Sequence, residues 1–203
     1  IMTLVLILEV AESQLVAQGD VTITINVEKE LKVKQGNSLL STLAAATQVD
    51  YIGEPVTQLA HALQAADRAR ASGDPELMLA ALLHDIGHLA DPNAPQMADL
   101  GTVNHEGLAQ DLLLKLGCSA RVAQLVGGHV DAKRYLMRRP SYAGKLSEAS
   151  RQTLAHQGGP MSDLEAVTFE ENPLHRDVLP VRAWDEAAKV PDAEVPGLDF
   201  WRP

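Results

Sequence analysis

The spacing of hydrophobic positions changes near residue 48, and this change predicts two unlike parts in the chain. Residues 21–27 alternate β-branched and polar side chains, and a polar turn at residues 28–30 leads into a second alternating run at residues 31–34. This pattern predicts a β-hairpin, and a short helix is expected over residues 38–47. A hairpin and one helix bury little surface alone, so we expect this part to dock on the rest of the chain or to be loosely ordered.

From residue 50 onward the apolar residues recur at helical spacing, with proline and glycine at the breaks. Pro55 can open a helix that runs to about Ser72, and Asp74 can cap a helix that runs to the residues around His84. Further helix boundaries are expected at His105, Gly117, Ser119, Gly127, the capping-box sequence 162–165, Pro173 and Lys189. The pattern predicts an all-α domain over residues 49–203, preceded by a small N-terminal β-hairpin extension over residues 1–48.

Composition narrows the classes of function. A chain of 203 residues supports one main domain, and its formal net charge of -10 argues against a nucleic-acid partner. Cys118 is the only cysteine, so no internal disulfide can form and a reducing, cytoplasmic setting is expected. The first eight residues are apolar, but a membrane-spanning helix needs roughly 20 and a signal peptide needs a basic start, so we expect neither a membrane span nor export.

The most informative feature is the apolar run 80–88, which carries three ionisable residues: His84, Asp85 and His88. A carboxylate buried beside imidazoles costs several kcal/mol unless a cation or dense hydrogen bonding compensates it. A bound metal ion would compensate it, and one aspartate can bridge two ions. His88, four residues after His84, is expected on the same helix face, where it could contact substrate, support a ligand or only hydrogen-bond within the core.

Other segments supply further candidate ligands in apolar or glycine-containing contexts: His61, His105, His129 and Asp185. Imidazole and carboxylate ligands together suit iron, manganese or zinc, whereas calcium prefers oxygen ligands alone. One such histidine by itself is more often a satisfied core residue. Their joint occurrence favours a metal centre.

The order of these residues resembles the HD-domain superfamily in its version with six metal ligands. Six segments resemble the phosphonate-cleaving di-iron oxygenases of the PhnZ type, namely 50–54, 81–88, 128–136, 147–154, 157–161 and 182–185. The likeness runs from about residue 50 to about residue 197. The His84-Asp85 pair is shared with HD phosphohydrolases, whereas the segments beginning at Tyr51, His129 and Gln157 are specific to the oxygenases.

The resemblance implies an HD-domain helical bundle that holds two iron ions in a mixed-valence state. Such an enzyme uses O2 to cleave the C–P bond of a small 1-hydroxyphosphonate, and its type substrate is 2-amino-1-hydroxyethylphosphonate, which yields glycine and phosphate. By the resemblance, the ligands of one iron are His61, His84, Asp85 and Asp185. Those of the other are the bridging Asp85 with His105 and His129.

The resemblance also assigns roles around the metals. Tyr51 would occupy the open position of the second iron until substrate binds, and Glu54 would receive the substrate ammonium. His88 joins these two as a candidate catalytic residue. The residues expected to contact the phosphonate are Lys133, Ser150, Gln157 and Arg182.

Residues 15–44 resemble the start of the ferredoxin-type domain in the F subunit of sodium-translocating NADH:quinone reductases, without the cysteines of that domain. On this view residues 1–48 are a fragment fused to a complete oxygenase. A genuine accessory hairpin is the other interpretation.

Three alternatives remain from the sequence. The metal ligands alone would also suit an HD phosphohydrolase that activates water against a phosphate ester. An inactive HD module that senses a ligand should lack a metal ligand, and none is missing. Within the oxygenases, the trimethylammonium analogue would give glycine betaine, but the low aromatic content favours a primary amine.

Overall fold

The computed structural model of the protein describes residues 38–51 and 53–202. Residues 38–45 are helical and continue into the 3₁₀ turn η1 (Ala46–Gln48). The α-helices that follow are α2 (Gln58–Ala69), α3 (Pro75–Leu83), α4 (His105–Lys115), α5 (Ala120–Gly127), α6 (His129–Leu136), α7 (Pro140–Ala143), α8 (Glu148–His156), α9 (Asp163–Glu171) and α10 (His175–Ala187). Four more 3₁₀ turns are η2 (Arg70–Ser72), η3 (Ile86–Leu89), η4 (Ala98–Leu100) and η5 (Leu198–Trp201).

The described part of the chain contains isolated β-bridges but no strand, in agreement with the predicted all-α class. The helix expected over residues 38–47 is present. The hairpin expected over residues 21–34 lies outside the described residues.

Helix ends follow local capping chemistry where the sequence offered it. The side chains of Asp74, Ser119 and Ser162 each accept a hydrogen bond from a backbone N–H in the first turn of the helix that follows. Ser162 forms a full capping box with Glu165. Gly117 ends the α4 region with a left-handed φ of 73°. These predicted boundaries are confirmed.

The expected start of a helix at Pro55 is wrong by three residues. Thr57 caps α2 by accepting a hydrogen bond from Ala60 N at 3.2 Å, so the helix begins at Gln58. Pro55 instead lies in the turn that leads from residue 51 into the helix. The threonine cap decides the boundary because its side chain satisfies an otherwise free N–H of the first turn.

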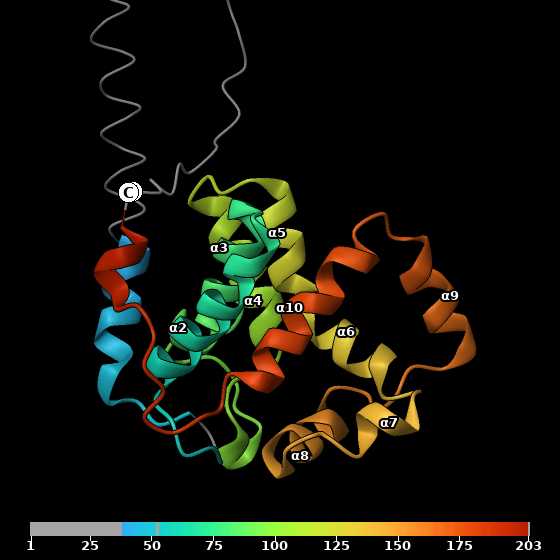
Figure 1. The fold of residues 1–203 in the computed structure, drawn as a ribbon. Coiled ribbons are helices and arrows are strands. Elements are labelled where there is room, and N and C mark those ends of the chain that lie inside the picture. The colour runs from blue at the N-terminus through green and yellow to red at the C-terminus, as the bar shows by residue number, and fades with distance from the viewer. Residues whose placement is uncertain (1–37, 52, 203) are drawn as a thin grey trace, which may run out of the picture.

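One hydrophobic core joins the helices that carry the site. α2 packs on α3 and α10, α3 also packs on α5, and α10 packs on α6. Figure 1 shows α2, α3, α4, α5 and α10 gathered in one bundle, with α7, α8 and α9 to one side. The largest fully buried apolar side chains are Leu82, Leu83, Ile86, Leu113, Leu125, Val122, Val126 and Val181. This packing fixes the ends of α2, α3, α4 and α10 relative to one another.

The helical segment before η1 belongs to the same core. Leu39, Leu40 and Leu43 are buried and cluster with the apolar side chains of α2 and α3. The docking expected of this segment is therefore present, while the domain boundary placed at residue 48 stays a prediction. No helix in the described part of the chain is both long enough and apolar enough to cross a membrane.

Candidate active site

The end of α3 sets the geometry of the site. The helix stops at Leu83, and Asp85 leaves the helical conformation with φ -102° and ψ 9° before η3 begins. Gly87 lets this turn approach the start of α4, because a Cβ at that position would lie 1.9 Å from the His105 carbonyl oxygen. His84 and His88 therefore do not share one helix face, and that prediction is wrong. The turn places Asp85 beside the first residue of α4.

Two histidines from different helices form the first cluster. His61 Nε2 lies 3.0 Å from His84 Nε2. The other ring nitrogen of each histidine faces a backbone carbonyl. His61 Nδ1 lies 2.9 Å from Ala188 O, and His84 Nδ1 lies 2.8 Å from Ala81 O. A carbonyl oxygen can only accept, so each Nδ1 carries a proton, and each Nε2 presents a lone pair when its ring is neutral. The two lone pairs face the same point.

Asp185 adds a third acceptor to this cluster. Its Oδ1 lies 3.5 Å from His61 Nε2 and 3.9 Å from His84 Nε2. The atom is buried and has no hydrogen-bond partner among the described residues. Three acceptors that converge in this way need a positive charge between them, from a proton or a metal ion.

The second cluster also pairs two histidines, at the start of α4 and of α6. His105 Nε2 lies 3.1 Å from His129 Nε2, and His129 Nδ1 faces Val126 O at 2.7 Å. The two Asp85 oxygens divide between the clusters: Oδ1 lies 3.3 Å from His105 Nε2 and 3.4 Å from His129 Nε2. Its Oδ2 lies 3.2 Å from His84 Nε2 and 3.6 Å from His61 Nε2. One carboxylate thus joins two sets of nitrogen acceptors.

The pKa values of these groups reflect burial together with close charges. Burial and the neighbouring His84 lower the pKa of His61 to about 4, so its imidazole is neutral. Burial also acts to lower the pKa of His84, but the Asp85 carboxylate outweighs it and raises that pKa to about 9, so without a metal ion His84 Nε2 would carry a proton that a bound ion would replace. Burial acts to raise the pKa of Asp85, whereas the charge of His84 holds it well below its usual range. The carboxylate is therefore ionised.

The six side chains fit a pair of metal ions. Two ligands at about 2.1 Å from one ion and at right angles to each other are about 3.0 Å apart, which is the separation of the facing Nε2 atoms in each cluster. The donor set is nitrogen and carboxylate oxygen without sulfur, which suits iron, manganese or zinc. Each set holds two imidazoles and one oxygen of Asp85, and Asp185 adds a further oxygen to the first.

Tyr51 and Glu54 enter the site from a tight turn before α2. Gly53 occupies the left-handed region with φ 69°, and a Cβ there would also lie 2.9 Å from Ala149 Cβ. The Tyr51 ring stacks on His61 with centroids 3.9 Å apart. Burial, the Asp85 charge and a hydrogen bond to Asp85 raise the pKa of Tyr51 well above its ordinary value. Tyr51 thus contacts a residue of the first cluster and the shared carboxylate.

His88 differs from the histidines of the two clusters in its tautomer. Its Nδ1 accepts a hydrogen bond from Thr102 N at 3.1 Å, so the proton of the neutral ring is on Nε2. Burial and the neighbouring His105 lower the pKa of His88 to about 3, and the two rings stack with centroids 4.1 Å apart. By distance alone a ring nitrogen of His88 could join Asp85 and His105 around one ion. The hydrogen bond from Thr102 makes it a donor instead.

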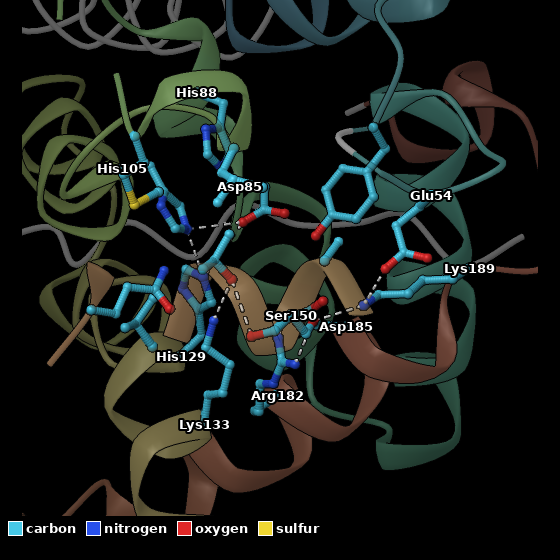
Figure 2. A pocket seen from close by; sticks show the side chains of 17 residues that line it. Glu54, Asp85, His88, His105, His129, Lys133, Ser150, Arg182, Asp185 and Lys189 are labelled. Carbon is cyan, nitrogen blue, oxygen red and sulfur yellow. Dashed lines mark hydrogen bonds and ion pairs between the residues drawn. The ribbon is translucent and has the colours of Figure 1, made fainter. Parts of the chain in front are cut away.

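A cavity of about 50 Å³ lies beside the second cluster and is lined by every candidate substrate residue. Figure 2 shows Lys133, Ser150 and Arg182 along one side of it, with Glu54 and Lys189 together at one end. The Lys133 side chain is buried and donates to Thr153 Oγ1 at 3.1 Å, with no carboxylate within ion-pair distance in the described part of the chain. Burial and the Arg182 charge lower the pKa of Lys133 to about 7. Such a cation lacks an anionic partner.

Arg182 and Ser150 have more hydrogen-bond and ion-pair partners than Lys133. Arg182 forms ion pairs with Asp185 and Glu186, and its Nε donates to Tyr142 Oη at 2.8 Å. Ser150 Oγ accepts from Arg182 and donates to Glu186. In this arrangement Arg182 holds Asp185 in place and has little spare capacity for an anion. Gln157 Oε1, by contrast, is buried without a hydrogen-bond partner among the described residues.

The sequence interpretation missed three polar residues of the site, namely Thr153, Glu186 and Lys189. Glu186 stands four positions after Arg182, and Lys189 four after Asp185. The spacing of Glu186 places it on the side of α10 that carries Arg182, which was an available signal, whereas Lys189 lies beyond the end of α10 and had no such signal. Thr153 offered none, because it reaches Lys133 only through the packing of α8 near α6.

Comparison with known proteins gives the family. No family model matches the chain. A [1-hydroxy-2-(trimethylamino)ethyl]phosphonate dioxygenase (glycine-betaine-forming) of Leisingera caerulea is 42% identical over 155 residues, which cover 75% of this chain and 78% of the relative. A hydroxymethylphosphonate dioxygenase of Gimesia maris is 42% identical over 152 residues, 73% of this chain and 75% of the relative. The chain belongs to the hydroxyphosphonate dioxygenase family. It is an enzyme of the oxygenase class.

An uncharacterized protein of Acanthamoeba polyphaga mimivirus is 40% identical over 181 residues, which cover 87% of this chain and 83% of the relative. An alignment that covers 87% of the 203 residues must include some residues before position 48. Part of the predicted N-terminal extension is therefore shared with this relative.

Proposed function

We propose that this enzyme cleaves the C–P bond of a small 1-hydroxyphosphonate with O2, at two iron ions in a mixed-valence state held by an HD-domain bundle. The observation that carries the proposal is the division of Asp85 between two histidine pairs beside a cavity that contains an unpaired ammonium. Family membership supports the class of reaction. The proposed ligands are His61, His84, Asp85 and Asp185 for one iron, and Asp85, His105 and His129 for the other.

The residues of the chain would receive the substrate as follows. Lys133 would pair with the phosphonate, since its ammonium donates to Thr153 and has no ionic partner among the described residues. His88 presents an Nε2–H at the same cavity. Met97, Leu100 and Val130 line the cavity and would keep water from it. Bound iron would supply the redox chemistry with O2 and lower the pKa of the substrate hydroxyl.

Glu54 would receive the tail of the substrate. Its Oε1 is buried and lacks a hydrogen-bond partner among the described residues, so it can accept from an N–H donor. A primary ammonium has such donors and a trimethylammonium group has none. We therefore propose 2-amino-1-hydroxyethylphosphonate, which would give glycine and phosphate, ahead of the trimethylammonium analogue.

The test is an aerobic incubation of the iron-loaded protein with 2-amino-1-hydroxyethylphosphonate, its trimethylammonium analogue and hydroxymethylphosphonate. We expect phosphate release together with O2 uptake, and no phosphate release when O2 is removed. Phosphate released from a phosphate ester at the same rate with and without O2 would instead identify a phosphohydrolase.

A further inference from the structure

Lys189 lies at the Glu54 end of the cavity and has several fixed partners. Its ammonium donates to Ser147 Oγ and Ser150 Oγ, both at 2.9 Å, and to Glu186 Oε2 at 3.3 Å. An ammonium has three N–H donors, so these acceptors use all of them. The position of the cation is therefore set by α8 and the end of α10.

Glu54 is the next charge beside this cation. Glu54 Oε1 lies 3.0 Å from Lys189 Nζ, and both side chains are 9% exposed. The contact lacks the direction of a hydrogen bond, since Glu54 Oε1 has no hydrogen-bond partner among the described residues. Lys189 thus compensates the charge of Glu54 and leaves its hydrogen-bonding capacity free.

The contact between Lys189 and Glu54 changes how strongly Glu54 attracts a charged ligand. A cationic tail would meet a carboxylate already compensated by a fixed cation, so its attraction to Glu54 is reduced while any N–H hydrogen bond is retained. A ligand without a tail is unaffected by this compensation. Two relatives are named for substrates that differ at this part, since one substrate has a trimethylamino tail and the other is hydroxymethylphosphonate, which has no tail.

We propose that Lys189 is a specificity-determining residue of this enzyme: it limits the preference of the cavity for substrates with a cationic tail by compensating Glu54. The inference rests on the proposed function. It names a role for a residue that the ligand set and the phosphonate contacts do not include.

The experiment compares the dissociation constants of hydroxymethylphosphonate and 2-amino-1-hydroxyethylphosphonate. They are measured by calorimetry on the iron-loaded full chain without O2, so that turnover does not interfere. Lys189→Met should raise the affinity for the amino compound relative to hydroxymethylphosphonate by about tenfold, because Glu54 would then be uncompensated. Lys189→Arg keeps the charge, so the ratio of the two dissociation constants should stay near its wild-type value. Lys145→Met, at an exposed position, is the matched control and should not change it.

A double variant, Glu54→Gln with Lys189→Met, tests whether the effect passes through Glu54. In this double variant the affinity for the amino compound relative to hydroxymethylphosphonate should no longer rise. A relative affinity that still rises would overturn the proposal. Equal losses of affinity for both ligands in Lys189→Met would show a purely structural lysine and would overturn it as well. Wild-type protein that binds both ligands but releases no phosphate with O2 would contradict the proposed function while leaving the role of Lys189 testable.

Discussion

Asp85→Asn is the substitution that tests the two-metal arrangement most directly. In the structure each Asp85 oxygen faces a different pair of histidine nitrogens, at 3.2 to 3.6 Å on one side and 3.3 to 3.4 Å on the other. An asparagine keeps one oxygen acceptor but replaces the other with an NH2 group, which donates and does not ligate metals. We therefore expect one of the two metal positions to be lost.

The size of the effect follows from the number of ligands. Structural zinc sites bind their ion with about 10 to 16 kcal/mol, or about 2.5 to 4 kcal/mol for each of four ligands. Loss of one ligand should then weaken a metal position by about two to three powers of ten. Among the described residues, Asp85 is the only carboxylate at the position with His105 and His129, so we expect this position to lose its ion first.

Metal content after dialysis is the assay. Wild-type protein should retain two ions per chain and Asp85→Asn one or fewer. Asp111→Asn changes an exposed aspartate on α4 and is the control, so it should retain two. Two ions held by Asp85→Asn with unchanged affinity would refute the reasoning that Asp85 bridges them.

Four further predictions concern single features of the site and of the chain. Tyr51→Phe removes a hydroxyl next to the shared carboxylate, and should change the absorption spectrum of the resting enzyme or its substrate affinity. His88→Gln should impair turnover at least tenfold yet keep both metals, whereas loss of an ion would make His88 a ligand. Phosphonate affinity should fall as the pH rises through about 7, where the Lys133 ammonium loses its proton, and Lys133→Met should lose this dependence. Deleting residues 1–48 removes three buried leucines, each worth about 1.5 to 3 kcal/mol, and should lower the melting temperature sharply.

The sequence was most informative where the deciding interaction is local. Asp74, Ser119 and Ser162 cap their helices as expected, because a cap needs only a side chain and a backbone N–H two or three residues later. The same reasoning misplaced the start of α2, because Pro55 can open a helix as well as Thr57 can cap one. Only the folded turn decides between them.

Burial explains why the candidate ligands could be read from the sequence. An ionisable residue in an apolar run needs a partner, and His84 and Asp85 stand in such a run. All the residues expected at the site do line it or its metal clusters, although their individual roles stay predictions. Lys189 was missed because nothing near it in sequence reveals that α10 ends beside Glu54 and α8.

The difference between His84 and His88 shows what the sequence pattern cannot contain. Both are histidines on the same apolar stretch, and a helical reading gives them equivalent positions. The chain leaves the α-helix between them, so His84 Nδ1 meets a backbone carbonyl and His88 Nδ1 meets the backbone N–H of Thr102. Opposite partners fix opposite tautomers, and a lone pair therefore faces the metal position in one case and an N–H faces the cavity in the other. The proposed division of these histidines between metal binding and substrate contact thus depends on one local break of the helix and on a loop 14 residues further along the chain.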